Sequence, residues 1–200
     1  MTESSATSKG AATREAILDR AYDIASSAGL EGLAIGPLAQ AVGMSKSGVF
    51  AHFGSREDLQ LAVLDAAGRR FFESVLLPAL KARRGLPRLR ALMLNWFEWV
   101  RTTAGGCVLL GSVTEYDDRP GILRERVLQH EQRWRSEVER AVRLAIDSGE
   151  LDAGMDPAQL AFELYAVALA VHHDAGLYGY EPARARGERA LQSLFAAHSP

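Results

Sequence analysis

The 200-residue sequence has a single cysteine and no long apolar run. One cysteine, Cys107, excludes an intrachain disulfide framework and suits a reducing compartment. No segment approaches the roughly 18 uninterrupted apolar residues that a membrane-spanning helix needs. The opening stretch MTESSATSKGAATR also lacks the apolar block of a signal peptide. We therefore expect a cytoplasmic protein with no membrane partner, stabilised by a hydrophobic core.

An excess of positive charge is also missing. The chain has 23 lysines and arginines against 25 aspartates and glutamates, which gives a net charge of −2. Residues 1–60 carry five basic side chains against seven acidic ones. This balance excludes indiscriminate nucleic-acid binding through a strongly basic surface, but it leaves room for a small local contact surface.

The alternation of apolar and polar residues that marks half-buried strands is absent as well. Helical spacing of apolar residues runs through most of the chain instead. Apolar residues make up 48% of the sequence, which is enough to form a substantial core. The pattern predicts an all-α fold, in which a three-helix N-terminal helix-turn-helix domain is joined to a larger C-terminal helical bundle.

The predicted N-terminal domain has three helices. The first spans residues 13–28, the second spans residues 35–42, and a short third helix follows its N-cap, Ser45. Gly43 ends the second helix, so the second and third helices form a helix-turn-helix. Residues 1–12 are expected to form a disordered tail.

A sequence similar to a capping box, Ser55 to Asp58, begins the C-terminal bundle. The helix that follows keeps its apolar period until Pro78. Further helices are predicted over residues 86–103, after Gly106, and over residues 122–148, 157–177 and 182–197. The domains are therefore predicted as a helix-turn-helix domain at 13–54 and a ligand-binding and dimerisation domain at 55–200.

The third helix has the composition of a helix that is presented to a partner outside the protein. Its start is small and polar, with Ser45, Ser47 and Gly48, which permits close approach to base edges and phosphates in a DNA groove. Lys46 adds a positive charge there. Because an ordinary surface turn would not explain the apolar side that Val49, Phe50 and Phe53 provide, we favour a groove-reading helix.

The run LEGLAIGPLAQAVGMSKSGVFAHFGSREDL resembles the DNA-binding domain of the TetR family of transcriptional regulators. The matching positions are Leu38, Ala39, Gly43, Ser45, His52, Phe53 and Ser55 to Leu59. Three positions depart from the family pattern: Ala34 replaces a threonine, Phe50 replaces a tyrosine, and Ala51 replaces a tyrosine or histidine. A second segment, GGCVLLGSVTEYDDRPG, is similar to a pattern of one branch of the family, and we assign it no function.

The resemblance implies a ligand-responsive regulator, most often a repressor, that binds a near-palindromic operator as a homodimer. By matching position, Lys46 and His52 contact phosphates, Ser47 and Gly48 face bases, and Thr13 or Arg14 steadies the flanking backbone. Ser45 and Phe50 complete the predicted DNA-binding set. For His52, packing on Phe53 is an equally good alternative, and Lys46 is alternatively a solvated lysine.

Family members commonly bind a small apolar or amphipathic effector inside the bundle. Side chains that could line such a cavity are Trp96, Trp99, Cys107, Tyr116, Trp134, Phe162, Tyr165 and His172. Aromatic residues at helical spacing are alternatively part of the core. The segment 157–177 could supply a dimer interface through Leu160, Leu164, Val167, Ala168 and Val171. These residues could alternatively complete the core of one chain.

Catalytic and metal-binding patterns are not found. We detect no nucleophile motif, phosphate loop or metal-ligand spacing, so we expect neither an enzyme nor a bound cofactor or metal. His172 and His173 point about 100° apart on a helix and have no completing ligand. Because the N-terminal part is slightly acidic, one alternative function stays open: a helical interaction module whose helix-turn-helix no longer binds DNA.

Overall fold

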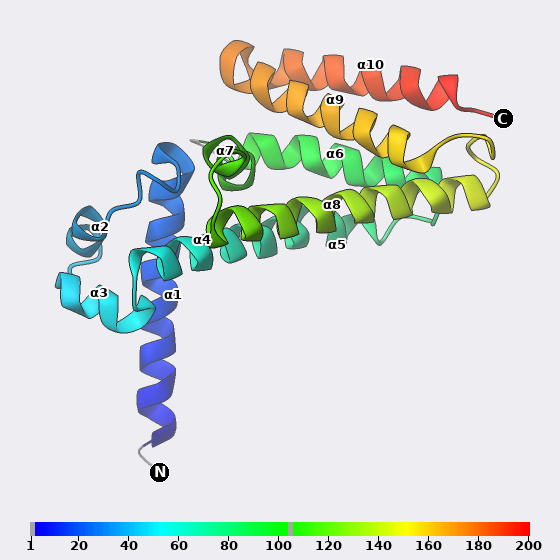
Figure 1. Ribbon diagram of the computed structural model, residues 1–200. Coiled ribbons are helices and arrows are strands. Elements are labelled where there is room, and N and C mark those ends of the chain that lie inside the picture. Colours follow the sequence, from blue (N-terminus) through cyan, green and yellow to red (C-terminus); the bar gives the residue numbers. More distant parts are fainter. Residues whose placement is uncertain (1–2, 104–105) are drawn as a thin grey trace. The chain divides into compact units, whose positions relative to one another are not determined.

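The computed structural model describes residues 3–103 and 106–200, and these residues are helical with no strand. The N-terminal helices are α1 (Glu3–Ala28), α2 (Ile35–Ala41), α3 (Lys46–Phe53) and α4 (Arg56–Phe71). A π-helical turn, η1 (Phe72–Leu76), and the short α5 (Leu77–Ala79) follow. The remaining helices are α6 (Leu86–Thr102), α7 (Val108–Tyr116), α8 (Ile122–Asp147), α9 (Pro157–Tyr178) and α10 (Tyr180–Ala197). The predicted all-α fold is confirmed (Figure 1).

The described residues form two compact units. The N-terminal unit consists of residues within 1–69 and 105–128, and the bundle unit consists of residues within 70–104 and 129–200. This division differs from the predicted boundary at residue 55. Part of the reason is that Val108, Tyr116, Leu123 and Val127 pack into the same core as the helix-turn-helix.

Helix α1 begins earlier than expected. Residues 1–12 were expected to form a disordered tail, but the structure continues the helix back to Glu3, and residues 1–2 lie outside the described part. The segment 3–12 has no proline and includes three alanines, so its sequence is compatible with a helix. Gly29, at a φ of 75°, ends α1, and its N–H donates to the Ala25 carbonyl at 2.9 Å.

The core of the N-terminal unit holds α3 against α1 and α4. Ile17 and Leu18 of α1, Val49 of α3, and Leu59 and Val63 of α4 are fully buried. In the bundle unit, α9 lies beside α10 and α6 (Figure 1). Among the described residues, no helix is both long enough and apolar enough to cross a membrane.

Candidate functional site

The start of α3 is fixed by its N-cap. Ser45 has an extended backbone, and its Oγ accepts a hydrogen bond from the Gly48 N–H at 3.1 Å. The Ser47 hydroxyl lies 3.0 Å from the same oxygen. The cap satisfies one of the free N–H groups at the helix start, while the dipole of the helix favours an anion at this end. The predicted cap is therefore present in the structure.

The turn before α3 is also formed as the sequence predicts. Gly43 has a φ of 66°, which favours glycine, and the Met44 N–H donates to the Ala39 carbonyl at 2.9 Å. At the other end of α2, Ala34 makes no side-chain cap. The departure from the family pattern at this position therefore leaves the start of α2 without a capping hydroxyl.

Helix α3 has one buried side and one exposed side. Val49 and Phe53 are buried, whereas Ser47 and Lys46 are exposed. Phe50 is 42% exposed, so the expectation that it helps to hold α3 against its neighbours is wrong. Phe50 lies four residues from Lys46, on the exposed side of the helix. Phe50 and Val49 are adjacent, so only one of them can face the core, and Val49 does so.

Lys46 lies close to α2. A Cβ atom added to Gly36 would stand 3.2 Å from the Lys46 Cε, so the glycine leaves space for the aliphatic part of the lysine. The ammonium group can then remain in water at the edge of the helix-turn-helix.

A cleft of about 360 Å³ lies in the N-terminal unit beside α3. Its lining includes Arg14 of α1, His52 of α3, Arg69 of α4 and Arg126 of α8. The Arg14 guanidinium lies 4.7 Å from the centre of the Phe53 ring. The cleft thus brings together two of the predicted phosphate-contacting residues with two arginines that no local sequence pattern linked to them.

Acidic groups share this cleft. Asp58 and Asp65 also line it, and Asp65 forms an ion pair with Arg126. Asp58 is engaged at the start of α4, where its N–H donates to the Ser55 Oγ at 2.9 Å and its carboxylate accepts from that hydroxyl at 2.6 Å. The local positive charge is therefore partly compensated. Thr13 is half-buried one residue before Arg14.

In the bundle unit, Phe71 lies at the centre of an aromatic cluster. Its ring centre is 5.8 Å from Trp96, 5.7 Å from Trp99 and 4.6 Å from Trp134, in edge-to-face contacts. Trp96 also lies 5.0 Å from Trp134 and 5.4 Å from Tyr165. Edge-to-face contacts at these separations are favourable for aromatic pairs. Four of the predicted cavity residues therefore meet, around a phenylalanine that the sequence did not single out.

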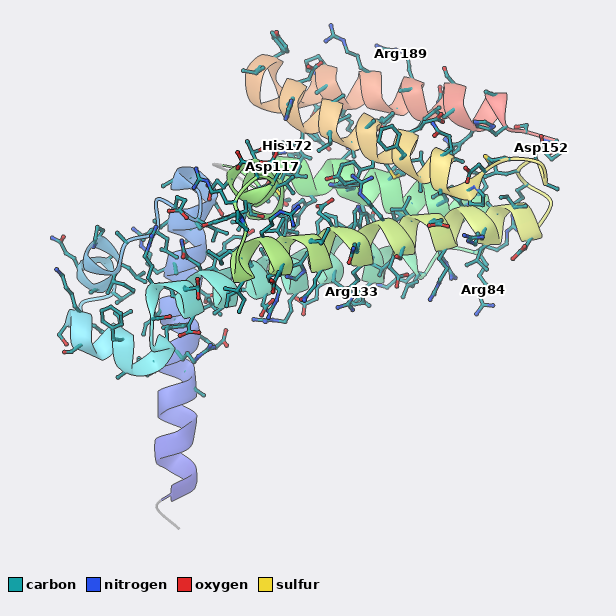
Figure 2. The ribbon with its side chains drawn as sticks, in the orientation of Figure 1. Arg84, Asp117, Arg133, Asp152, His172 and Arg189 are labelled. Atoms are coloured by element: carbon teal, nitrogen blue, oxygen red, sulfur yellow. The ribbon has the colours of Figure 1, made fainter. Side chains whose placement is uncertain are left out.

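Three buried nitrogen atoms of the bundle unit have no hydrogen-bond partner among the described residues. They are Nε1 of Trp99, Nε1 of Trp134 and Nδ1 of His172. His172 is carried by α9 (Figure 2). Burial, together with the charge of His173, lowers the pKa of His172. Buried polar atoms are usually paired, so a further partner would be favourable at each of these three nitrogens.

A half-buried carboxyl group, that of Glu131, adjoins the aromatic cluster. Burial raises the pKa of Glu131, against the opposing effects of its hydrogen bond with Tyr165 and of the nearby Arg135. Burial also raises the pKa of Tyr165, and the charge of Glu131 acts in the same direction. The Arg135 guanidinium lies 4.0 Å from the centre of the Tyr165 ring.

Three predicted cavity residues do not join this cluster. Cys107 and Tyr116 belong to the N-terminal unit, where Tyr116 donates to Glu31 at 2.6 Å. Phe162 is 57% exposed on α9. These three residues are therefore not part of the aromatic cluster, since spacing along the chain does not tell which core a side chain enters.

The predicted dimer face of α9 is also corrected. Leu160, Leu164, Ala168 and Val171 are buried within the single chain, and Val167 is half-buried. A Cβ atom on Gly187 of α10 would stand 2.4 Å from the Val171 Cγ2, so α10 packs directly on this side. The large apolar residues that α9 exposes are Phe162, Leu177 and Tyr178.

Family models match both parts of the chain. Residues 17–63 match the model of bacterial regulatory proteins of the tetR family, and residues 85–191 match the C-terminal domain described as tetracyclin repressor-like. The second match alone covers more than half of the chain. The chain belongs to the TetR family.

Solved structures of TetR-family regulators have the same fold. A TetR transcriptional regulator from Chloroflexus aurantiacus J-10-FL is 28% identical, with a TM-score of 0.83 and 94% of each chain covered. A TetR-family regulator from Streptomyces coelicolor is 20% identical, with a TM-score of 0.84 and coverage of 100% of this chain and 97% of the other. AibR, solved with isovaleryl coenzyme A and operator DNA, is 24% identical, with a TM-score of 0.73 and coverage of 92% and 98%. A comparison with curated proteins gives no match.

Membership of the TetR family establishes the general activity. The protein is a DNA-binding transcriptional regulator with a helix-turn-helix in its N-terminal unit and a ligand-binding domain of the TetR type. Regulators of this family are generally non-enzymatic DNA-binding proteins. Within the described residues, no group of three histidine, cysteine or acidic side chains is arranged to hold a metal ion.

Proposed function

We propose that this TetR-family protein is a repressor that binds a near-palindromic operator as a homodimer and releases it when a small apolar or amphipathic effector binds. The observation that carries the proposal is the two-sided α3, which buries Val49 and Phe53 and exposes Lys46, Ser47 and Phe50 beyond a capped start. A helix of this kind can enter the major groove with its first residues against the bases.

The DNA contacts are divided by position on the N-terminal unit. Ser45, Ser47, Gly48 and Phe50 are proposed to face the bases from the start and exposed side of α3. Lys46, His52, Arg14 and Thr13 are proposed to contact phosphates. Few basic side chains are available, so main-chain contacts and dimerisation are expected to supply much of the affinity.

The effector is proposed to bind at the aromatic cluster, against Trp96, Trp99, Trp134, Tyr165 and His172. The buried indole N–H groups of Trp99 and Trp134, which have no partner among the described residues, support this choice, since a ligand with hydrogen-bond acceptors could satisfy both of them. The structure of AibR shows that a protein of this fold can be isolated with both an acyl thioester and operator DNA.

Helix α4 is proposed to transmit the effect of effector binding to the recognition helix. It carries Phe71, the centre of the aromatic cluster, at its C-terminal end, and only two residues separate its start from the end of α3. Displacement of Phe71 by an effector would therefore act along one helix toward the recognition helix. An effector changes DNA affinity only if it binds the two arrangements unequally.

The homodimer is proposed to form through the outward side of α9, with Phe162, Leu177 and Tyr178 in contact with a second copy. These large apolar side chains are exposed in the single chain, whereas the residues first predicted are buried in it. Contact with a second copy would remove these large apolar side chains from water.

One observation favours a second candidate function. The first 60 residues carry more acidic than basic side chains, which fits an interaction module that has lost DNA binding. A gel shift against the region upstream of the protein's own gene, repeated at several salt concentrations, separates the two. A repressor retards this DNA, with an affinity that falls linearly on a log–log scale as salt rises. If the protein retards neither this DNA nor DNA from other regions at low salt, the result would favour the interaction module.

A further inference from the structure

The C-terminal end of α7 contacts the loop between α1 and α2. Both belong to the N-terminal unit, and the loop, residues 29–34, connects the first helix to the helix-turn-helix. The contacting residues, Glu115 and Tyr116, lie in the segment GGCVLLGSVTEYDDRPG, to which neither the DNA-binding nor the effector proposal gives a role. Their contacts with the loop are specific and mostly polar.

Tyr116 holds the side chain of the loop residue Glu31. Its hydroxyl donates to the Glu31 Oε1 at 2.6 Å. The same hydroxyl lies 3.5 Å from the Nε2 of Gln60, which donates to the Leu30 carbonyl at 2.7 Å. Tyr116 and Gln60 are 4% and 3% exposed, so these polar groups depend on one another for their hydrogen bonds.

Glu115 holds the backbone of the same loop. Its Oε2 accepts a hydrogen bond from the Glu31 N–H at 3.1 Å. Gly29 has a φ of 75°, and a Cβ atom there would stand 1.8 Å from the Glu115 Oε1. Glycine at this position therefore both forms the turn and leaves space for the carboxylate.

Arg56, the first residue of α4, completes the attachment of the loop. Its Nε donates to the Leu33 carbonyl at 2.9 Å, and its Nη2 donates to the Glu31 carbonyl at 2.6 Å and to the Glu31 Oε2 at 3.2 Å. The hydrogen bond from Tyr116 lowers the pKa of Glu31, and Arg56 and Arg119 act in the same direction. The loop is thus held from two elements: the start of α4, which follows α3, and the end of α7.

We propose that Glu115 and Tyr116 form a latch that positions the helix-turn-helix for operator binding, so that the placement of α7 sets the DNA affinity. The latch fixes residues 29–33, and α2 begins two residues later and packs on α3. Neither latch residue contacts DNA; both are positioning residues. This inference rests on the proposed DNA-binding function and adds a second point of control besides α4.

The first test measures the loop in the free protein. In Tyr116→Phe the hydroxyl is lost at nearly constant volume, and we expect amide hydrogens of residues 29–35 to exchange several-fold faster than in the wild type. Tyr180→Phe is the matched control, because it removes a tyrosine hydroxyl that donates to a glutamate, Glu98, in the bundle unit and should leave exchange in this loop unchanged. In an NMR titration, the pKa of the Glu31 carboxyl should rise in Tyr116→Phe. Unchanged exchange and an unchanged Glu31 titration would overturn the latch.

The second test measures DNA binding with a duplex that the wild-type protein recovers from a random-sequence pool. Tyr116→Phe should weaken affinity for this duplex about tenfold. The slope of log affinity against log salt concentration (the salt slope) should not change, because no phosphate contact is removed. Unchanged affinity, or a smaller salt slope that reveals a direct phosphate contact, would overturn the proposal.

A second variant keeps the test decisive if Tyr116→Phe does not fold. Glu115→Ala removes the carboxylate that accepts from the Glu31 N–H, and it should loosen the same loop and weaken binding to the same duplex, whereas Glu125→Ala on α8 should do neither. Wild-type behaviour of Glu115→Ala in both measurements would then overturn the latch. If the wild-type protein recovers no duplex, the proposed function fails, and the exchange measurement alone decides whether Tyr116 holds the loop.

Discussion

At the scale of single residues, the proposed DNA interface depends on side chains that are small or that extend from the surface of α3. Lys46 is exposed and lies against Gly36, so its ammonium group can reach a phosphate without disturbing the fold. Gly48 and Ser47 leave little bulk between the helix backbone and the bases. Each of these roles can be tested by one substitution.

Lys46→Ala should weaken binding to all DNA sequences and reduce the salt slope by about 1, because one phosphate contact and its released counterion are lost. Fluorescence anisotropy at several salt concentrations measures both quantities. Lys81→Ala, which removes an exposed lysine of the bundle unit, is the control. A salt slope equal to that of the wild type would show that Lys46 is exposed to solvent and makes no phosphate contact.

Gly48→Leu should abolish specific binding and leave the fold intact. A Cβ atom at Gly48 would stand 3.1 Å from the Met44 Cε and 3.3 Å from the Ser45 Oγ, and the flexible methionine can move aside. Each blocked base contact should cost about 1–3 kcal/mol, and a bulky side chain that holds α3 away from the groove blocks several contacts at once, so specific binding is lost. Circular dichroism checks the fold, and retained operator affinity would remove Gly48 from the interface.

The pH dependence of stability tests the half-buried carboxyl group of the bundle. Because burial raises the pKa of Glu131 above its ordinary 4.5, the folded protein binds its proton more tightly than the unfolded chain does. The contribution of Glu131 to the free energy of unfolding therefore falls as pH rises above the ordinary value and through the raised one. In Glu131→Gln this loss should disappear, so the variant gains stability relative to the wild type between about pH 4 and pH 7. Urea unfolding at both pH values measures the difference, and a constant difference would contradict the pKa shift.

At the scale of elements, α3 is a very short helix with a well-formed N-cap. It spans eight residues, which is too short for a stable isolated helix, so its cap and its buried side must stabilise it. The Ser45 cap is therefore a structural requirement for the recognition surface as well as a possible DNA contact.

Ser45→Ala should lower the free energy of unfolding by about 1 kcal/mol, because the Gly48 N–H loses its acceptor. Ser47→Ala is the matched control, since the Gly48 N–H donates to the Ser45 Oγ and the Ser47 hydroxyl hydrogen-bonds only with that oxygen among the described residues. Chemical denaturation of both variants gives the comparison. Equal stabilities would show that solvent replaces the cap at no cost.

Helix boundaries could be predicted from the sequence where neighbouring residues mark them. Gly43 and Ser45 mark the end of α2 and the start of α3 within three residues, and both predictions are confirmed. Phe50 could not be placed in the same way, because it is adjacent to Val49 and only tertiary packing decides which of the two is buried. The contact between Tyr116 and Glu31 joins residues 85 positions apart, and no periodic pattern reports it.

At the scale of the whole molecule, helix α9 shows why a dimer surface is hard to predict. It is apolar on more than one side, so periodicity cannot tell which side faces its own chain. The structure buries the side with Leu160 and Leu164 and exposes the side with Phe162. The proposed homodimer therefore uses the residues that the single chain leaves uncovered.

Phe162→Asp should give a monomer and weaken operator binding, because a charge would be buried at the centre of the proposed dimer contact. Sedimentation equilibrium measures the oligomeric state. Ser136→Asp, which adds the same charge at an exposed position of α8, should remain dimeric. A dimer of unchanged affinity in Phe162→Asp would move the interface to another surface.

The central claim is that this TetR-family protein reads a specific operator with α3, and selection from a random-sequence pool of duplex DNA tests it most directly. Sequencing of the bound duplexes should show one enriched near-palindrome, with half-sites separated by one helical turn, about 34 Å, or a multiple of it. The enrichment should disappear with Gly48→Leu. Recovery of no enriched sequence at low salt, or the same sequence with Gly48→Leu as with the wild type, would contradict the account.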